Sequence, residues 1–326
     1  MAYTTIDNPE LYFQVVTYTG SGSSHAITLG GSVDLSPDLV IIKGRAATST
    51  TSFFDTVRGA TKQLATSRIG GNAQGTVAES LKSFDSDGFT VGTDGDVNYS
   101  GDGYVAWCFL ESATPGFDIV TWTVPASGST TISHSLSAVP KMIISKSTDT
   151  GNTDWETHHN AIGNANTVQL NTTAALGDNN AYNDTDPTSS VFSVTTAGFG
   201  ANRAMVSYVF APKQGFSKFG EYTGNNSTDG TFVWTGFRPA FVMNKQTNGT
   251  EGWMIHDSGR DPTNPLGNHF TAQGTGGDSD RVSVDFLSNG FKWRVANTDT
   301  NNGEYLYMAF ADAPFVNSEG VPNNAR

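Results

Sequence analysis

The chain has 326 residues, a formal net charge of -13 and a sequence pI of about 4.7. A surface of this charge repels phosphate backbones, which argues against binding of nucleic acid by charge neutralisation. Charged residues make up only 15% of the chain, against about 25% in typical globular proteins. Gly, Ser, Thr, Asn and Asp take their place. This composition is typical of turn-rich β proteins, because strands favour Thr and aromatic residues whereas turns favour Gly, Asn and Asp.

Three stretches of the chain share one order of landmarks, which indicates an internal repeat. Each stretch closes with an apolar strand that ends in phenylalanine, and the three closing phenylalanines are spaced by 101 and 100 residues. We therefore predict three tandem domains, each long enough to bury a core of its own. The predicted segments are an N-terminal arm at 1–13, domains at 14–112, 116–212 and 216–313, and a C-terminal tail at 314–326.

Each predicted domain begins with a strand and then has a proline, a short apolar run and a lysine six residues after the proline. Proline suits the entry of a strand, and a continuous apolar run indicates a strand covered on both faces. We predict that the lysine marks the point where that strand reaches the solvent-exposed surface. Including the closing phenylalanines, the landmarks are Pro37, Lys43 and Phe109, then Pro140, Lys146 and Phe210, then Pro239, Lys245 and Phe310.

The rest of each domain contains an aromatic strand, a Gly-Phe pair and the closing strand. The pairs Gly88-Phe89, Gly198-Phe199 and Gly290-Phe291 are predicted to form hairpin turns, in which glycine allows a positive φ. Helical patterns are nearly absent. We therefore predict an all-β fold of three tandem, pseudo-repeated β-sandwich domains, for which jelly-roll and lectin-like topologies both remain open.

The single cysteine, Cys108, lies inside the first closing strand, Tyr104–Phe109. A reactive thiol needs an electropositive neighbour, and the sequence around Cys108 offers none. We expect Cys108 to be a buried hydrophobic residue, together with Trp107 and Phe109.

Two carboxylates in the second domain raise the question of glycoside hydrolysis. Asp154 and Glu156 flank Trp155, and glycosidases use two carboxyl groups. The other two domains keep no such pair, so a solvated strand edge is the favoured interpretation. The adjacent residues His158 and His159 point to opposite faces of a strand, and no third ligand is suitably spaced, so we predict no metal site and no cofactor.

Two further groups of residues suggest binding sites. Asp94–Asn98 begins like a calcium loop but lacks the required glycine and glutamate, so an Asp/Gly/Asn turn is predicted there. Aromatic rings beside polar groups can stack on sugar rings if they are exposed. The candidate glycan contacts are Trp155, Trp253, His256 and Asp257, with Arg260 beside the last three.

Several motifs of the first domain resemble a module of tailed-bacteriophage virion proteins that is described as structural or tail-fibre-like. The motifs lie at 18–23, 37–43, 54–62, 83–90 and 104–108. The later domains keep the proline–lysine strand, the Gly-Phe pair and the closing strand, but they lack the run at 55–62. The resemblance implies a role in the virion and supplies no catalytic residues.

Three hypotheses follow for the function. The first is a non-enzymatic virion structural protein that binds other virion proteins, as a capsid decoration (cement), head-fibre or tail-fibre-associated component. The alternative is a carbohydrate-binding protein that attaches the particle to a host-surface glycan, and the third is a depolymerase that uses Asp154 and Glu156. We also expect a homo-oligomer, with a trimer as one form. We expect no membrane insertion, because no stretch approaches about 20 apolar residues.

Overall fold

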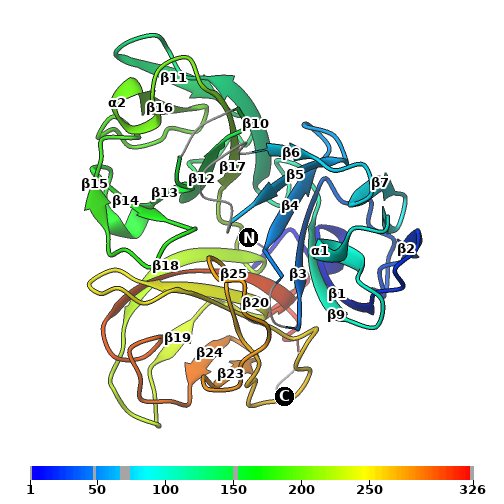
Figure 1. The fold of residues 1–326 in the computed structure, drawn as a ribbon. Helices are drawn as coiled ribbons and strands as arrows, with labels where there is room; N and C mark the ends of the chain where they lie inside the picture. Colours follow the sequence, from blue (N-terminus) through cyan, green and yellow to red (C-terminus); the bar gives the residue numbers. More distant parts are fainter. Residues whose placement is uncertain (1, 47–48, 67–73, 150–152, 324–326) are drawn as a thin grey trace.

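The structure is a computed structural model that describes residues 2–46, 49–66, 74–149 and 153–323. Strands account for 44% of the chain and helices for 5%. All the paired strands are antiparallel, and they form larger and smaller sheets (Figure 1). The prediction of an all-β fold is therefore confirmed.

The first part of the chain, here called unit 1, contains a six-stranded sheet and a three-stranded sheet. In spatial order, the large sheet consists of β1 (Phe13–Thr19), β9 (Gly103–Phe109), β3 (Leu39–Gly44), β4 (Ser52–Asp55), β5 (Lys62–Ala65) and β6 (Gln74–Thr76). The small sheet consists of β2 (His25–Ile27), β8 (Gly88–Val91) and β7 (Leu81–Asp85). Two short helices, η1 (Pro9–Leu11) and α1 (Gly95–Asn98), complete the unit.

Units 2 and 3 follow with corresponding strand orders. The large sheet of unit 2 consists of β10 (Phe117–Thr123), β17 (Ala204–Phe210), β12 (Met142–Ser147), β13 (Glu156–His159), β14 (Asn166–Gln169) and β15 (Gly177–Asp178). Its small sheet pairs β11 (Ser129–Ser133) with β16 (Val191–Thr195), and its helices are η2 (Asn160–Ile162) and α2 (Thr196–Phe199). Unit 3 has a large sheet of β18 (Ser217–Thr223), β25 (Glu304–Pro314), β20 (Phe237–Gln246), β21 (Trp253–Asp257) and β22 (Phe270–Thr271), and a small sheet of β19 (Phe232–Trp234), β24 (Gly290–Trp293) and β23 (Val284–Leu287).

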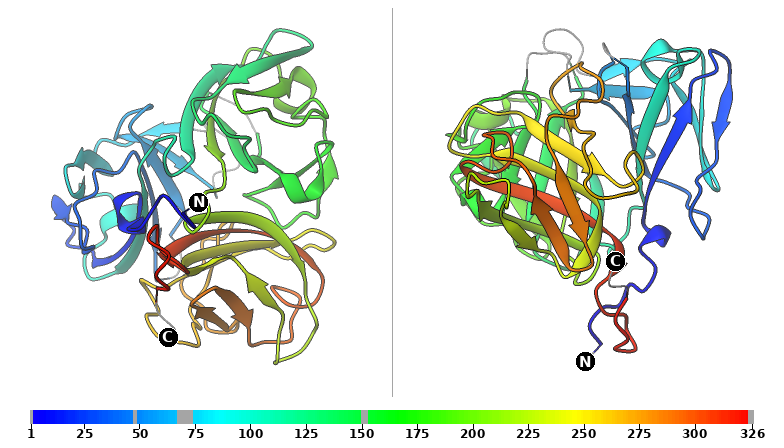
Figure 2. Two further views of the ribbon diagram at one scale, coloured as in Figure 1. Left: turned by 180° about the vertical axis from the view of Figure 1, so that it is seen from behind. Right: turned by 90° about the horizontal axis from the view of Figure 1, so that it is seen from below.

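In every unit the closing strand pairs with the first strand on one side and with the proline–lysine strand on the other. Phe109 is opposite Phe13 and Leu39 in unit 1. Phe210 and Phe310 occupy the corresponding positions on β17 and β25. The three units are arranged around a common centre (Figure 1), which the left view of Figure 2 also shows.

The closing strand of unit 1 is buried on both of its faces. Because side chains alternate across a strand, Ala106 and Cys108 pack with residues of the small sheet, whereas Trp107 and Phe109 belong to the core shared with the other units. The predicted burial of Trp107, Cys108 and Phe109 is confirmed.

The closing phenylalanines of all three units meet at the centre of the molecule. The ring centroids of Phe109 and Phe310 are 5.1 Å apart, those of Phe210 and Phe310 are 6.0 Å apart, and those of Phe109 and Phe210 are 6.2 Å apart. The same apolar cluster contains residues from the large sheets of every unit. Units 1 and 2 therefore each bury a core between their own two sheets, and the large sheets of all three units also share a central core, which the sequence did not suggest.

The arm and the tail lie side by side at one end of the molecule (Figure 2). The Thr4 hydroxyl donates a hydrogen bond of 2.7 Å to the Gln214 carbonyl, and the Tyr3 hydroxyl donates one of 2.8 Å to the Gly236 carbonyl. The Ser318 backbone N–H donates to the Asp7 carboxylate over 2.7 Å. The described parts of both termini therefore pack on their own chain.

One predicted hairpin is wrong. Gly88 and Gly290 do begin the second strand of a hairpin, but Gly198 and Phe199 lie in α2. Pairing places Phe192 of β16 opposite Ile132. Phe89 and Phe291 occupy the equivalent positions in the other small sheets, opposite Ile27 and Val233. The Gly-Phe pair did not predict the hairpin of unit 2 because the equivalent phenylalanine, Phe192 on β16, has no glycine before it.

Candidate functional site

The three landmark lysines, Lys43, Lys146 and Lys245, are buried. The prediction that each lies where its strand reaches the solvent is therefore wrong. The Lys43 ammonium donates to the carbonyls of Ser49 and Gly274, at 2.7 and 2.5 Å. Since Gly274 belongs to unit 3, this bond joins two units. Backbone carbonyls replace the water that an ammonium normally requires.

The other two lysines are held in the same way. The Lys146 ammonium donates to the carbonyl of Thr153, and the Lys245 ammonium donates to the Glu251 carbonyl over 2.7 Å and to the Thr173 carbonyl over 3.3 Å. Thr173 belongs to unit 2, so Lys245 also joins two units. Burial lowers the pKa of each of the three lysines to about 8, because desolvation disfavours the charged form.

A buried ion pair joins units 1 and 2. Asp55, at the end of β4, accepts a hydrogen bond of 2.5 Å from the Arg58 Nε and one of 2.8 Å from the Tyr208 hydroxyl of β17. Arg58 Nη2 also donates to the Tyr208 oxygen over 3.1 Å. Burial raises the pKa of Tyr208 far above its usual value, so the phenol stays neutral.

The corresponding pair of unit 3 makes an equivalent contact with unit 1. Asp257, at the end of β21, accepts bonds of 2.7 Å from Arg260 Nε and 3.2 Å from the Trp107 indole N–H of β9. Arg260 also bonds to Asp278 over 2.7 Å, and its guanidinium lies 4.1 Å from the ring centroid of Phe270. The Asp–Arg pair of unit 1 therefore recurs in unit 3.

A histidine takes the place of the aspartate in unit 2. The register places His159 opposite Met142, just as Asp55 is opposite Leu39 and Asp257 is opposite Phe241. His159 Nε2 lies 3.2 Å from the Tyr307 carbonyl of unit 3, and its Nδ1 accepts the N–H of Ala161. Burial lowers the pKa of His159 to about 3. Each unit thus contacts the closing strand of the next one.

The residues proposed as glycan contacts are inside the molecule. Trp155 is 1% exposed and Trp253 is 0% exposed. The Trp155 ring lies 4.7 Å from that of Phe53 in unit 1, and the Trp253 indole donates to the Gln169 carbonyl of unit 2 over 2.9 Å. His256 and Asp257 are also buried. These residues therefore do not form an exposed sugar-binding patch: Trp155, Trp253 and Asp257 contact other units, and His256 packs against His269 and Trp293 inside unit 3.

The two carboxylates of unit 2 are held by neighbouring side chains. Glu156 is buried rather than solvated, and it accepts bonds from Thr167 Oγ1 and Gln169 Nε2, at 3.0 and 3.2 Å. Asp154 accepts a bond of 2.9 Å from Asn171 Nδ2. Burial raises the pKa of Glu156. The hydrogen bonds of both carboxylates thus connect residues in and before β13 to residues in and after β14.

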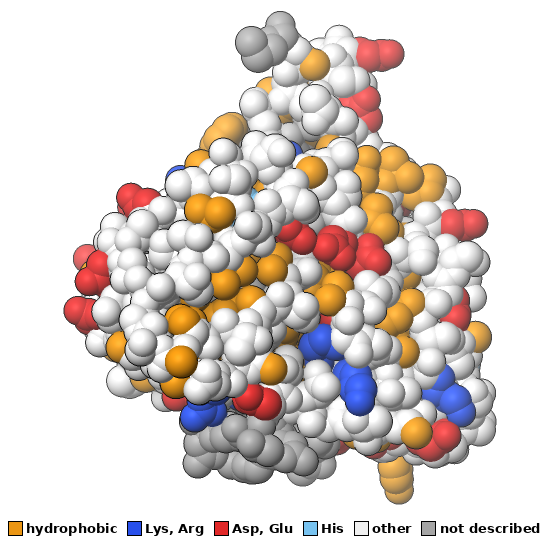
Figure 3. Space-filling model, turned by 90° about the horizontal axis from the view of Figure 1, so that it is seen from above, with side chains coloured by type: hydrophobic (Ala, Val, Ile, Leu, Met, Phe, Trp, Pro, Cys, Tyr) orange, Lys and Arg blue, Asp and Glu red, His pale blue; other side chains and the backbone are white. Residues whose placement is uncertain are grey.

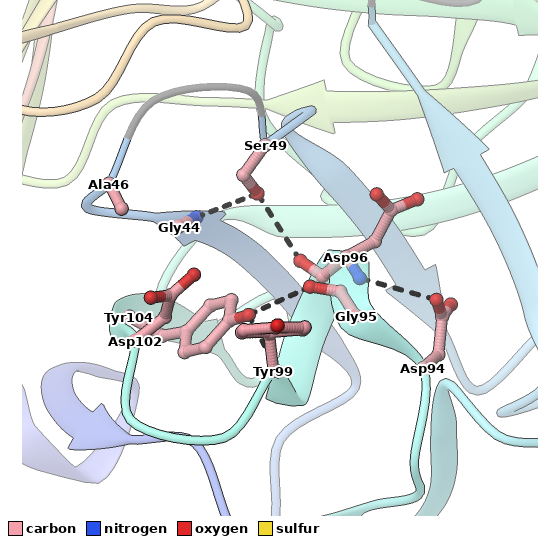
Figure 4. Close-up of a pocket in the computed structure, with 9 residues that line it drawn as sticks. All are labelled: Gly44, Ala46, Ser49, Asp94, Gly95, Asp96, Tyr99, Asp102 and Tyr104. Carbon is pink, nitrogen blue, oxygen red and sulfur yellow. Dashed lines mark hydrogen bonds between the residues drawn. The ribbon is translucent and has the colours of Figure 1, made fainter. Parts of the chain in front are cut away.

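An open pocket of about 430 Å³ lies beside α1 in unit 1 (Figure 4). The predicted Asp/Gly/Asn turn forms this helix instead, and Asp94 caps it by accepting the N–H of Asp96 over 3.2 Å. The Tyr104 hydroxyl donates to the Gly95 carbonyl over 2.8 Å. The carboxylates of the pocket wall give it an acidic surface, beside which Tyr99 is exposed. Across the described part of the chain, no three His, Cys, Asp or Glu side chains are placed to hold a metal ion.

The junctions between units carry shallow pockets as well. One of about 390 Å³ lies between units 1 and 2, beside Arg58 and Trp122, and one of about 470 Å³ lies between units 2 and 3, beside Ile162 and Tyr222. On the face shown in Figure 3, hydrophobic side chains gather near the middle with charged side chains beside them. The two pockets correspond in position but differ in their side chains, so the junctions do not repeat one ligand site.

The sequence analysis named Asp257 and Arg260 only in connection with a glycan site, and it did not identify the contacts that join the units. The signal was present as Asp55-x-x-Arg58 and Asp257-x-x-Arg260, two Asp–Arg pairs with the same spacing at the end of equivalent strands. It also missed the exposed pair Phe232 and Trp234, whose signal is an alternating strand with two large outward rings.

Comparisons with known proteins give a family and no relative of known function. No curated protein and no solved structure matched the chain. None of the helices in the described residues is long and apolar enough to cross a membrane. A family model matches residues 8–314, which lie in all three units. The chain belongs to the family described as Domain of unknown function (DUF7483).

Proposed function

We propose that this protein is a non-enzymatic structural component of a tailed-bacteriophage virion, where it acts as a capsid decoration, head-fibre or tail-fibre-associated protein. One observation carries the proposal. The buried Asp–Arg pairs serve contacts between the units, as in the hydrogen bonds that Tyr208 donates to Asp55 and Trp107 donates to Asp257. The resemblance of unit 1 to a virion module supports the same role.

The arrangement of the units also suits attachment to a particle. Three similar units around one axis present a surface with approximate three-fold symmetry, which matches a three-fold position on a capsid or a trimeric fibre. The arm and the tail lie together at one end, so the two ends of the assembly differ. We propose that the end bearing the arm and tail contacts other virion proteins.

Binding of a host glycan through Trp155 and Trp253 is not favoured. Stacking requires an exposed ring face, and both rings are covered by neighbouring units. A depolymerase that uses Asp154 and Glu156 is not favoured either, because both carboxylates are hydrogen-bonded to side chains of the same sheet region.

The proposal is tested by analysing purified phage particles. Particles from a density gradient should contain this chain at a fixed molar ratio to the major capsid protein in quantitative mass spectrometry. The lysate fraction without particles serves as the control for adhering protein. Detection of the chain in the lysate but not in the particles would contradict the proposal.

A further inference from the structure

The small sheet of unit 3 exposes two large aromatic rings on one face. In β19, Phe232 is 43% exposed and Trp234 is 50% exposed, whereas Val233 between them is buried. Because side chains alternate along a strand, both rings point to the same, outer face. β19 is the edge strand of its sheet, on the outer side of unit 3 in Figure 1.

The other two units show that this fold does not need those rings. Val233 corresponds to Ile27 and Ile132, since each is opposite the phenylalanine of the neighbouring strand. The outward residues that flank these positions are small, namely Ala26 and Thr28 in unit 1 and Thr131 and Ser133 in unit 2. Exposure of large apolar rings is unfavourable unless they contact a partner. The pair in unit 3 therefore indicates a binding surface.

The surroundings of the rings are polar and carry charges of both signs. The Lys218 ammonium lies 4.3 Å from the ring centroid of Trp234 and donates to the Trp234 carbonyl over 2.6 Å. On β24, Lys292 pairs with Asp229 over 2.6 Å, and the Asp229 side chain is 82% exposed. Donors and acceptors therefore lie beside the rings, which suits a ligand with many hydroxyl groups.

The size of the surface favours a sugar over a protein. Each ring can bury at most about 250 Å², so the pair falls short of the roughly 800 Å² per partner that a stable protein interface requires. The apolar C–H face of a sugar ring, by contrast, matches the area of one aromatic ring. The net charge of -13 disfavours a polyanionic glycan.

We propose that Phe232 and Trp234 form a platform on which the sugar rings of a neutral polysaccharide stack. Lys218, Lys292 and Asp229 then bind the hydroxyl groups of the sugar. This surface is separate from the buried residues Trp155 and Trp253, and the inference does not depend on the virion role.

Affinity gel electrophoresis with the full chain tests the platform. The probes are dextran, laminarin and mannan as neutral polysaccharides, with alginate and heparin as acidic ones. The wild-type chain should be retarded by at least one neutral probe. The double variant Phe232→Thr/Trp234→Ser, which gives unit 3 residues like those of unit 2, should bind that probe at least tenfold more weakly. Trp234→Phe keeps a ring and should retain most of the binding.

Tyr99→Ser is the matched control, since Tyr99 is an exposed aromatic residue of unit 1, and it should bind like the wild type. Unchanged circular dichroism and melting of all variants show that the fold is kept. Retardation of wild type by no neutral probe, or equal retardation of wild type and double variant, would overturn the proposal. So would self-association of the wild type that the double variant abolishes. Incorporation of the chain into particles is measured separately. Failure of the proposed virion role can therefore be distinguished from failure of the proposed sugar platform.

Discussion

Asp55, Arg58 and Tyr208 form a buried polar contact between units 1 and 2. Asp55→Asn leaves the Arg58 guanidinium buried without its counter-charge, which is expected to cost about 3–5 kcal/mol of unfolding free energy. Tyr208→Phe removes one hydrogen bond and is expected to cost about 1–3 kcal/mol. Because Tyr208 bonds to both ionic partners, the double variant should be less destabilised than the sum of the single variants.

Chemical denaturation of the four proteins measures this coupling. Glu79→Gln is the control, because the Glu79–Lys82 pair is solvent-exposed and should contribute less than about 1 kcal/mol. Additive effects of Asp55→Asn and Tyr208→Phe would show that the contact between the units is not energetically coupled.

His159 makes the stability depend on pH. Its pKa is about 3 in the folded chain against 6.5 for an ordinary histidine, so the unfolded chain binds a proton between these values and the folded chain does not. Its contribution is therefore complete above pH 6.5 and is lost as the pH falls towards 3, by up to about 1.4 kcal/mol per pH unit. Glu111 has the opposite effect, because burial and Asp118 raise its pKa to about 7.

The contribution of His159 is isolated by comparing the wild type with His159→Asn. The difference in unfolding free energy between the two proteins should shrink as the pH falls from 6.5 to 4. NMR titration should show that the His159 ring stays neutral at pH 4. Titration of this ring near pH 6.5 in the folded protein would refute the assignment.

Residue burial was the property that the sequence predicted least well. The apolar run before Lys43 correctly indicated an interior strand, but the lysine itself is covered because carbonyls of two different units bind its ammonium. Trp155 and Trp253 were candidate glycan contacts on the condition that they are exposed, and the sequence did not reveal that they are buried. Their partners, Phe53 and the Gln169 carbonyl, lie in other units, and no local pattern reveals such contacts.

At the scale of elements, β9 shows how one strand serves two cores. Cys108 packs against the small sheet of unit 1, and burial raises the pKa of its thiol. Cys108→Ser places a hydroxyl at this site and is expected to cost about 1–3 kcal/mol through desolvation. A bulky thiol reagent should not modify the native chain but should modify the urea-unfolded chain. Rapid modification of the native protein would contradict this position of β9.

The order and the type of the strands were largely predictable from the sequence. The landmarks Pro37, Lys43 and Phe109 correctly located β3 and β9, because proline and apolar runs act locally. The hairpin expected at Gly198 was wrong because a glycine alone does not distinguish a turn from the short helix α2. The small sheets were not distinguished from the large ones, because pairing of distant strands leaves little local signal.

At the scale of the whole molecule, three similar segments form one body. The sequence predicted separate sandwiches and did not reveal that their large sheets also pack against one another. An apolar strand has the same sequence pattern whether its second face contacts the small sheet of its own unit or another unit. The contacts among Phe109, Phe210 and Phe310 show that the second faces meet each other. Loss of any one unit would expose the apolar faces of the other two.

Differential scanning calorimetry of the full chain tests this shared core most directly. Because the large sheet of each unit buries one face in the central cluster shared with the other two units, the chain should unfold in a single transition whose calorimetric enthalpy equals the van't Hoff enthalpy. Separate transitions for the units, with a calorimetric enthalpy two to three times the van't Hoff value, would show that each unit is stable by itself and would contradict the shared core.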